Sequence, residues 1–148
     1  MIKHVSLSLA LCIGCVSTSA VAAEDPIVAR KAIMQSVGAA AGAGGGMLKG
    51  EIPFNPAVAT LVLRTVRAAS YSFGDYFPAG SETGMETTAS PKIWEDMAGF
   101  SEKLAKFRAD ADAAANSKPA TLEEFKTAFG SVAQNCKGCH ENYRIKKN

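Results

Sequence analysis

Residues 131–148 read SVAQNCKGCHENYRIKKN, and at their centre stands the pentapeptide Cys136-Lys137-Gly138-Cys139-His140. The chain of 148 residues contains only 4 cysteines and 2 histidines, so this short stretch concentrates two scarce residue types. Residues three apart lie on the same face of a helix, so a helical stretch would present both thiols side by side. The imidazole of His140 would follow them in the next position of the helix. The rest of the sequence indicates which chemistry these three side chains can carry out.

The N-terminal segment has the order of a secretory signal peptide. A basic start is followed by an apolar run and then by small residues that end at Ala23, which predicts a signal peptide over residues 1–23. The apolar run is too short to span a bilayer, so no transmembrane helix is predicted. Cys15 loosely matches the end of a lipoprotein signal, but Cys12 stands where that signal has a branched aliphatic residue. A lipid anchor at Cys15 and a buried N-terminal helix are therefore the alternatives.

Cleavage after Ala23 would leave residues 24–148 as one domain. It removes one of the 16 basic residues and none of the 14 acidic ones, so the net charge falls from +2 to +1. Nucleic-acid-binding proteins show a strong basic excess, so no nucleic-acid partner is expected. The cysteines and histidines that remain are Cys136, Cys139 and His140. A single cysteine pair does not make a disulfide scaffold.

Two helices are predicted in the first half of the chain. Residues 26–49 carry Pro26 in the first turn and apolar or small residues at helical spacing, and Gly50 is a plausible stop. The second helix begins at Asn55, an N-cap type of residue, and runs to about residue 73. Its predicted buried stripe consists of Val58, Leu61, Val62, Val66 and Ala69.

Two further helices are predicted after the loop at residues 77–91, which contains two prolines and two glycines. One opens at Pro91, and its apolar residues step by three and four: Ile93, Met97, Phe100, Leu104 and Phe107. The last begins in a capping box of Thr121 and Glu124, and its stripe continues through both cysteines to Tyr143. The fold predicted from these elements is all-α, an antiparallel up-down-up-down four-helix bundle.

The pentapeptide has the form C-x-x-C-H, which is the attachment sequence of c-type haem. The two thiols would add to the two vinyl groups on one edge of the porphyrin, and His140 would be the proximal iron ligand. The sequence therefore predicts one covalent haem c per chain. Three other interpretations compete: a thioredoxin-like redox pair, half of a zinc site, and a chance structural pair. The first needs alternating strands and helices, and the second would need carboxylates or a second chain, because residues 24–148 contain no other Cys or His.

The sixth position of the iron is open to methionine, to lysine or to no ligand, because His140 is the only histidine of the predicted mature chain. In an antiparallel bundle the end of the fourth helix lies beside the start of the first. At about 1.5 Å per residue, Met34 and Met97 both come to the level of His140. Met47 lies toward the other end and Met85 lies in the loop. Core packing is favoured for Met97, because it continues the buried stripe of its helix.

A helical bundle with C-x-x-C-H near the end of its fourth helix resembles the class II cytochromes c, the cytochrome c' family. Four stretches carry the resemblance in the family's order: RKAIMQSVG (30–38), YFPAGS (76–81), SPKIW (90–94) and CKGCHENYR (136–144). The resemblance implies a four-helix bundle, covalent haem c and a location in the bacterial periplasm. Many members are dimers, so a homodimer is consistent with it.

The resemblance also implies roles for individual residues. The family places a residue of the first helix over the distal face of the haem, and Met34 occupies this position. A bulky residue that cannot ligate leaves a five-coordinate, high-spin iron, whereas methionine gives the low-spin cytochrome c-556 type. The predicted iron ligands are therefore His140 and Met34.

Further haem contacts are predicted around these ligands. Arg30 and Arg144 are expected to reach the propionates, with solvated surface cations as the equal alternative. Trp94, Phe100 and Tyr143 are expected to line the haem, and core packing would explain them equally well.

Two functions follow from the two kinds of iron. A six-coordinate iron favours an electron carrier that exchanges electrons with periplasmic redox proteins. A five-coordinate iron favours a protein that binds nitric oxide or carbon monoxide. An enzyme such as a peroxidase is not expected, because the sequence offers no distal histidine.

Overall fold

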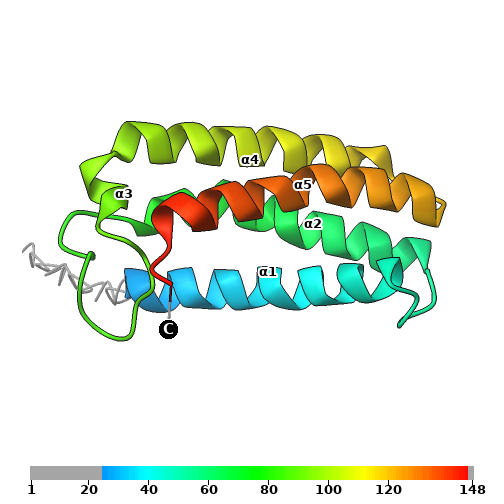
Figure 1. Cartoon of the computed structure of the whole chain (residues 1–148), viewed down its shortest axis with the longest axis horizontal. Coiled ribbons are helices and arrows are strands. Elements are labelled where there is room, and N and C mark those ends of the chain that lie inside the picture. The colour runs from blue at the N-terminus through cyan, green and yellow to red at the C-terminus, as the bar shows by residue number, and fades with distance from the viewer. Residues whose placement is uncertain (1–24, 147–148) are drawn as a thin grey trace, which may run out of the picture.

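A computed structural model describes residues 25–146 of the chain (Figure 1), so the predicted signal peptide and Cys15 lie outside the described residues. Its elements are α1 (Pro26–Leu48), α2 (Pro56–Ser72), the 3-10 helix η1 (Phe73–Tyr76), α3 (Lys92–Glu95), α4 (Met97–Ser117) and α5 (Leu122–Tyr143). Residues 25–146 form no strand, only an isolated bridge between Ala89 and Arg144. None of the helices in this range is long and apolar enough to cross a membrane.

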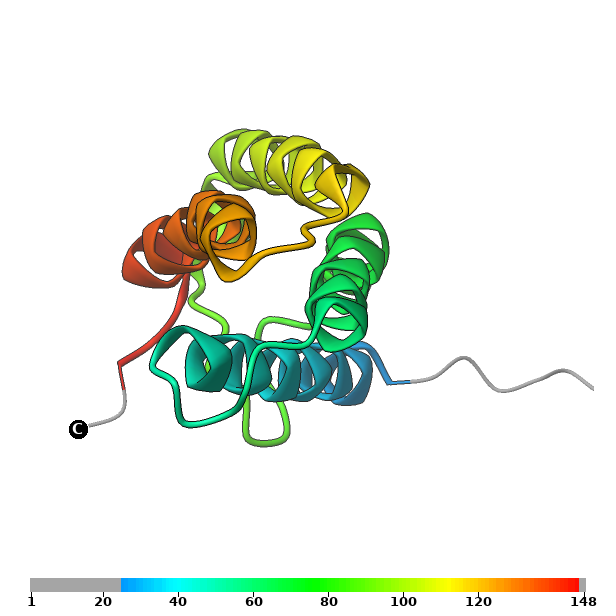
Figure 2. The same ribbon diagram turned by 90° about the vertical axis from the view of Figure 1, so that its right-hand side faces the viewer.

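The four long helices alternate in direction along one axis. In Figure 1, α1 and α4 run one way and α2 and α5 run the other, so that α5 ends beside the start of α1. The end-on view in Figure 2 shows these four helices around a common centre. The closest packing joins α1 to α2, α2 to α4 and α4 to α5, whereas α1 and α5 approach each other more loosely. The predicted up-down-up-down bundle is confirmed.

Side-chain caps start three of the long helices where the sequence predicts a helix. The Asp25 carboxylate accepts hydrogen bonds from the amides of Ile27 and Val28 in α1. Asn55 caps α2 in the same way. Thr121 and Glu124 form the predicted capping box, with the Glu124 amide donating to the Thr121 hydroxyl at 3.3 Å. These bonds satisfy amides that have no partner inside the helix.

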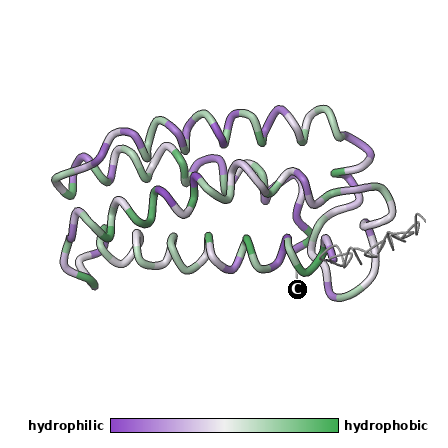
Figure 3. The backbone as a smooth tube through the Cα atoms, turned by 180° about the vertical axis from the view of Figure 1, so that it is seen from behind, coloured by the Kyte–Doolittle hydropathy of each residue, from purple (hydrophilic) through white to green (hydrophobic). Residues whose placement is uncertain are grey.

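The core divides into two clusters along the bundle. The larger one lies between the four long helices and contains Phe125, Met47, Leu63 and Val66, each at most 2% exposed. The smaller one lies near the start of α4 and contains Phe77, Ile93, Phe100 and Tyr143. Figure 3 shows polar and apolar residues alternating along α4, whereas α1 is pale to green along most of its length. α1 buries small residues such as Ala29, Gly44 and Gly46 together with the larger Ile27, Val37 and Met47.

The third predicted helix is interrupted at Asp96, which separates α3 from α4. Asp96 has φ −131° and ψ 55°, and its carboxylate accepts a hydrogen bond from the Gly99 amide at 3.1 Å. This break restarts the helical periodicity, and Met97 is 39% exposed. The expectation that Met97 packs in the core is therefore wrong. Ile93 and Phe100, which flank the break, are buried as predicted.

The buried face of α2 also differs from the predicted one. Val62, Val66 and Ala69 are buried as expected, but Val58 is 37% exposed and Leu61 is 64% exposed, so both predictions are wrong. The reason is that α2 packs against α1 on one side and α4 on the other. Its buried face is consequently centred on the stripe that includes Ala59 and Leu63.

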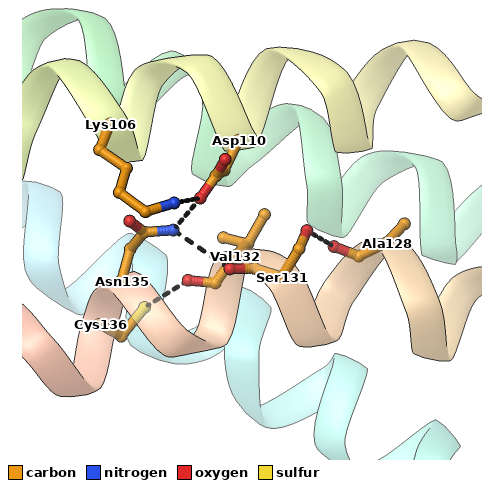
Figure 4. A network of polar contacts seen from close by, with 7 residues as sticks. All are labelled: Lys106, Asp110, Ala128, Ser131, Val132, Asn135 and Cys136. Carbon is orange, nitrogen blue, oxygen red and sulfur yellow. Dashed lines mark hydrogen bonds and ion pairs between the residues drawn. The ribbon is translucent and has the colours of Figure 1, made fainter.

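A polar network joins α4 to α5 at the level of the first cysteine (Figure 4). The Asn135 amide donates to Asp110 Oδ2 at 2.7 Å, and Lys106 Nζ donates to the same oxygen at 2.6 Å. The Asn135 amide and then the Lys106 ammonium hold the pKa of Asp110 below its usual value. The network therefore fixes the turn of α5 that precedes Cys136 against α4.

Gly44 is predicted to be required for packing between α1 and α5. A Cβ atom at this position would come within 2.9 Å of Phe129 and 3.2 Å of Phe125, two rings that stack on each other. We expect Gly44→Ala to lower the free energy of unfolding by about 1–3 kcal/mol, as overpacking does. The matched control is Gly42→Ala, where a Cβ would meet no atom within 4 Å. The control should raise stability by about 0.5–1 kcal/mol in denaturant unfolding, because alanine restricts the unfolded chain.

The Asp110 network predicts a pH dependence of stability with a definite sign. Because the folded-state pKa of Asp110 lies below its unfolded value of about 3.9, the stabilisation is complete above that value. It is lost as the pH falls through the folded-state pKa. The free energy of unfolding of the wild type should exceed that of Asp110→Asn by up to about 1 kcal/mol at neutral pH. Denaturant titrations should show this difference shrinking in acid, and a difference that grows there would contradict the network's role.

Candidate functional site

A cavity of about 400 Å³ opens at the end of the bundle where α1 begins and α5 ends. Its walls come from α1, η1, the loop at residues 77–91, α3, α4 and α5. Apolar side chains form most of the lining, including Val37, Phe73, Ile93, Leu104 and Phe107. The volume falls within the range of about 300–1,000 Å³ that is typical of small-molecule and cofactor sites.

Cys136 and Cys139 both lie in the wall of this cavity as free, half-buried thiols. Their spacing puts them on one face of α5, and the Cys136 thiol approaches the carbonyl oxygen of Val132 at 3.7 Å. Burial raises the pKa of both thiols, so neither is an activated thiolate of the kind that redox enzymes use. The cysteine pair is thus presented to an apolar space rather than to solvent.

His140 follows the cysteine pair in the last turns of α5 and lines the same cavity from its exposed rim. Loss of water around part of the ring, and then the charge of Arg144, hold the pKa of His140 below its usual value. A lower pKa favours the neutral imidazole that metal ligation requires. Among residues 25–146, no three His, Cys, Asp or Glu side chains are grouped so that they could hold a metal ion.

Met34 reaches the cavity from α1 and is half-buried there. Residues 25–146 contain three further methionines, and none of them lines the cavity. Met47 lies in the larger core cluster at 1% exposure, and Met85 and Met97 are exposed. Two lysines, Lys31 and Lys103, also line the cavity, so lysine remains an alternative sixth ligand.

Arg30 lies one turn before Met34 and is only 4% exposed. Its Nη1 donates to the carbonyl oxygen of Tyr76 at 2.8 Å and to the Ser81 hydroxyl at 2.9 Å, and its Nη2 donates to the Ser81 carbonyl oxygen at 2.8 Å. The guanidinium carbon also lies 4.8 Å from the ring centre of Phe77. Burial lowers the pKa of Arg30, which Asp25 and Glu82 partly oppose. Arg30 lines the cavity, but its guanidinium holds the loop that forms the wall.

The other predicted contacts are divided between the cavity and its surroundings. Tyr143 and Arg144 line the cavity, with Tyr143 buried and Arg144 exposed. Trp94 does not line it. The Trp94 ring instead packs on Phe77 at 5.8 Å between centres, and its indole N–H donates to the Pro78 carbonyl oxygen at 3.2 Å.

The sequence did not single out several residues of the cavity wall. Thr87, Thr88 and Ala89 belong to the loop, and the bridge between Ala89 and Arg144 brings them to the cavity wall. The spacing of apolar residues in the sequence does not predict this contact. Lys31, Lys103 and Asn135 are polar residues at the edges of helical stripes. Asn135 stands four residues before Cys139, so a helical wheel of the fourth helix would have placed these two residues on one face.

The residues at this cavity fit a covalently bound haem c. Two thiols three residues apart stand on one wall, an imidazole follows them in the same helix, and a thioether reaches the same space from another helix. These are the groups that c-type haem uses for attachment and axial ligation. The apolar lining suits a macrocycle that is largely apolar.

Comparisons with known proteins agree with this chemistry. The family model described as Cytochrome C' matches residues 25–144. A cytochrome c-556 from Agrobacterium fabrum is 35% identical over 145 residues, covering 98% of each chain. A cytochrome c' from Rhodopseudomonas palustris is 42% identical over 131 residues, covering 86% of this chain and 87% of that protein. A solved structure of cytochrome c' from Rhodopseudomonas palustris has a TM-score of 0.80 at 40% identity, and covers 85% of this chain and 100% of that one.

The similarity therefore spans the whole bundle, including the cavity and the helix that carries C-x-x-C-H. It confirms the resemblance that the sequence motifs indicated, and with it the cofactor. The chain belongs to the cytochrome c' family and carries covalent haem c.

Proposed function

We propose that this chain is an electron carrier, with haem attached through Cys136 and Cys139 and with His140 and Met34 as the two iron ligands. The observation that supports this most directly is the position of Met34. Of the methionines in residues 25–146, it alone lines the cavity that the cysteines and His140 share. Thioether and imidazole together are the axial pair of electron-transferring cytochromes c.

The residues of the chain would hold the cofactor and limit access to it. When bound, haem iron supplies reversible one-electron chemistry. The two thiols fix one edge of the group to α5, and the side chains of Phe100, Leu104 and Phe107 keep water from the apolar part of the cavity. A closed pair of ligands requires little rearrangement when the charge of the iron changes, which suits electron transfer.

The setting of this activity is part of the proposal. The signal peptide predicted over residues 1–23 would export the chain to the bacterial periplasm, where its partners would be redox proteins. No substrate turnover is proposed, so the chain would not be an enzyme. A homodimer is also proposed, since a solved cytochrome c' of the same family is described by its ligand-controlled dimer dissociation.

Binding of nitric oxide or carbon monoxide is the second candidate function. It is favoured by the similarity to a cytochrome c' at 42% identity, beside a cytochrome c-556 at 35%. In this alternative Met34 would cover the distal side without ligating the iron. Space for such a movement exists next to it, because a Cβ at Gly38, one turn later, would meet no protein atom within 4 Å.

Haem attachment should depend on both thiols. The double variant Cys136→Ser with Cys139→Ser should retain no haem on a denaturing gel stained for haem, because no thioether bond can form. Each single variant should show weaker staining than the wild type. Haem that stays attached in the double variant would rule out the C-x-x-C-H assignment.

Ligation by Met34 should be visible in the spectrum of the ferrous protein. We expect sharp low-spin bands in the wild type, and a high-spin spectrum with carbon monoxide binding and a lower reduction potential in Met34→Ala, because thioether ligation favours Fe(II). The matched control is Met97→Leu, which alters an exposed methionine outside the cavity and should leave the spectrum unchanged. A wild type that is already high-spin and binds carbon monoxide readily would put gas binding first.

A further inference from the structure

The turn of α5 that carries His140 is also the last turn of the helix, which ends at Tyr143. The last four carbonyl groups of a helix have no partner inside it, so this part of a helix frays most easily. An iron ligand placed there needs external support if its direction is to stay fixed. Tyr143, three residues after His140, lies on the same face of the helix and is only 6% exposed.

Tyr143 is held by its main chain, its ring and its hydroxyl group. Its carbonyl oxygen accepts a hydrogen bond from the Ser90 amide at 3.0 Å, and the amide of Ile145 donates to the Thr88 carbonyl oxygen at 2.8 Å. Its ring packs edge-on against Phe100, with 5.2 Å between centres. The hydroxyl donates to Asp96 Oδ2 at 2.9 Å. These contacts come from the loop and from the start of α4, so they tie the end of α5 to two other elements.

Asp96 is suited to this contact because a second hydrogen bond, from the Gly99 amide, fixes the conformation of its carboxylate. Its carboxylate also accepts the Gly99 amide as the N-cap of α4, so the same group that starts α4 receives the Tyr143 hydroxyl. A Cβ at Gly99 would lie 2.5 Å from Asp96 Oδ2 and 2.8 Å from Oδ1. In its present position, the carboxylate therefore occupies space that a side chain at residue 99 would need.

We propose that Tyr143 and Asp96 are positioning residues for the proximal ligand. The hydrogen bond between them fixes the last turn of α5, and this turn sets the direction of the His140 imidazole. This inference rests on the proposed ligation by His140. It adds a group from the start of α4 to the cysteines and the histidine that α5 supplies.

The test compares two tyrosines that make the same kind of hydrogen bond at different positions relative to the cavity. Tyr143→Phe and Tyr71→Phe each remove a hydroxyl that donates to an aspartate, Asp96 at 2.9 Å and Asp112 at 2.7 Å. Only Tyr143 lines the cavity. Both changes are made in holoprotein that also carries Met34→Ala, so that the iron–histidine stretching band of the ferrous protein is observable by resonance Raman spectroscopy.

We expect Tyr143→Phe to shift this band to lower frequency and to broaden it, because the imidazole is no longer held in one direction. Tyr71→Phe should leave the band in place, although it can lower stability by a similar amount. Gly99→Ala should reproduce the shift without altering any atom of Tyr143, since the new methyl group displaces the Asp96 carboxylate.

The outcomes separate this inference from the proposed function. A band that survives in His140→Ala would overturn the ligation by His140 and the inference with it. A band that is lost in His140→Ala but is the same in Tyr143→Phe, Gly99→Ala and Tyr71→Phe would overturn the positioning role alone. Equal shifts in Tyr143→Phe and Tyr71→Phe would also overturn it, because they would report a general loss of rigidity.

Discussion

The buried guanidinium of Arg30 holds together the end of the bundle on which the site depends. Burying a cation is costly unless hydrogen bonds replace its water, and here two carbonyl oxygens and a hydroxyl from residues 76–81 do so. The faces of Phe77 and Trp94, at 4.8 and 5.5 Å, add attraction between the cation and the rings. Because α1 and α5 approach each other loosely, the cavity wall needs this link between α1 and the loop.

The two ends of the bundle are stabilised by different means. Away from the cavity, close packing of Phe125 and Phe129 against Gly44 brings α1 and α5 together. At the cavity, polar contacts with definite directions accompany the smaller apolar cluster: Arg30 to the loop, Asn135 to Asp110, and Tyr143 to Asp96. Directional bonds can keep helices in register while leaving a space between them, which apolar packing alone would close.

Local signals in the sequence were sufficient for the helices and for the centre of the site. Asn55 and the Thr121–Glu124 box mark helix starts because they satisfy nearby amides, which needs no knowledge of the fold. Cys136, Cys139 and Met34 all line one cavity. Helical rise and antiparallel order put both Met34 and Met97 at the level of His140, and the family resemblance selected Met34.

Tertiary contacts decided the features that the sequence did not predict. Asp96 breaks a helix whose apolar periodicity is otherwise unbroken, because its carboxylate is held by the Gly99 amide and the Tyr143 hydroxyl. Met97 is exposed as a consequence. Trp94 was expected to line the haem, yet its N–H donates to the Pro78 carbonyl oxygen of the loop. The Tyr143 hydroxyl and the Pro78 carbonyl oxygen are 47 and 16 residues away from Asp96 and Trp94, so local sequence patterns do not predict these contacts.

Overall similarity to known proteins cannot choose between the two kinds of iron. Relatives described as cytochrome c-556 and as cytochrome c' match this chain at 35% and 42% identity, and structures described by both names match its fold. Whether the iron has five or six ligands depends on the thioether of Met34 and on the distance between α1, which carries Met34, and α5, which carries His140. Met34 is half-buried on a helix fixed by Arg30 one turn earlier, so its backbone has little freedom to withdraw. Its unbranched side chain can still adjust to the iron, because methionine has three rotatable bonds. A fixed backbone with a flexible donor favours ligation over a steric lid, for which a rigid bulky residue would serve better.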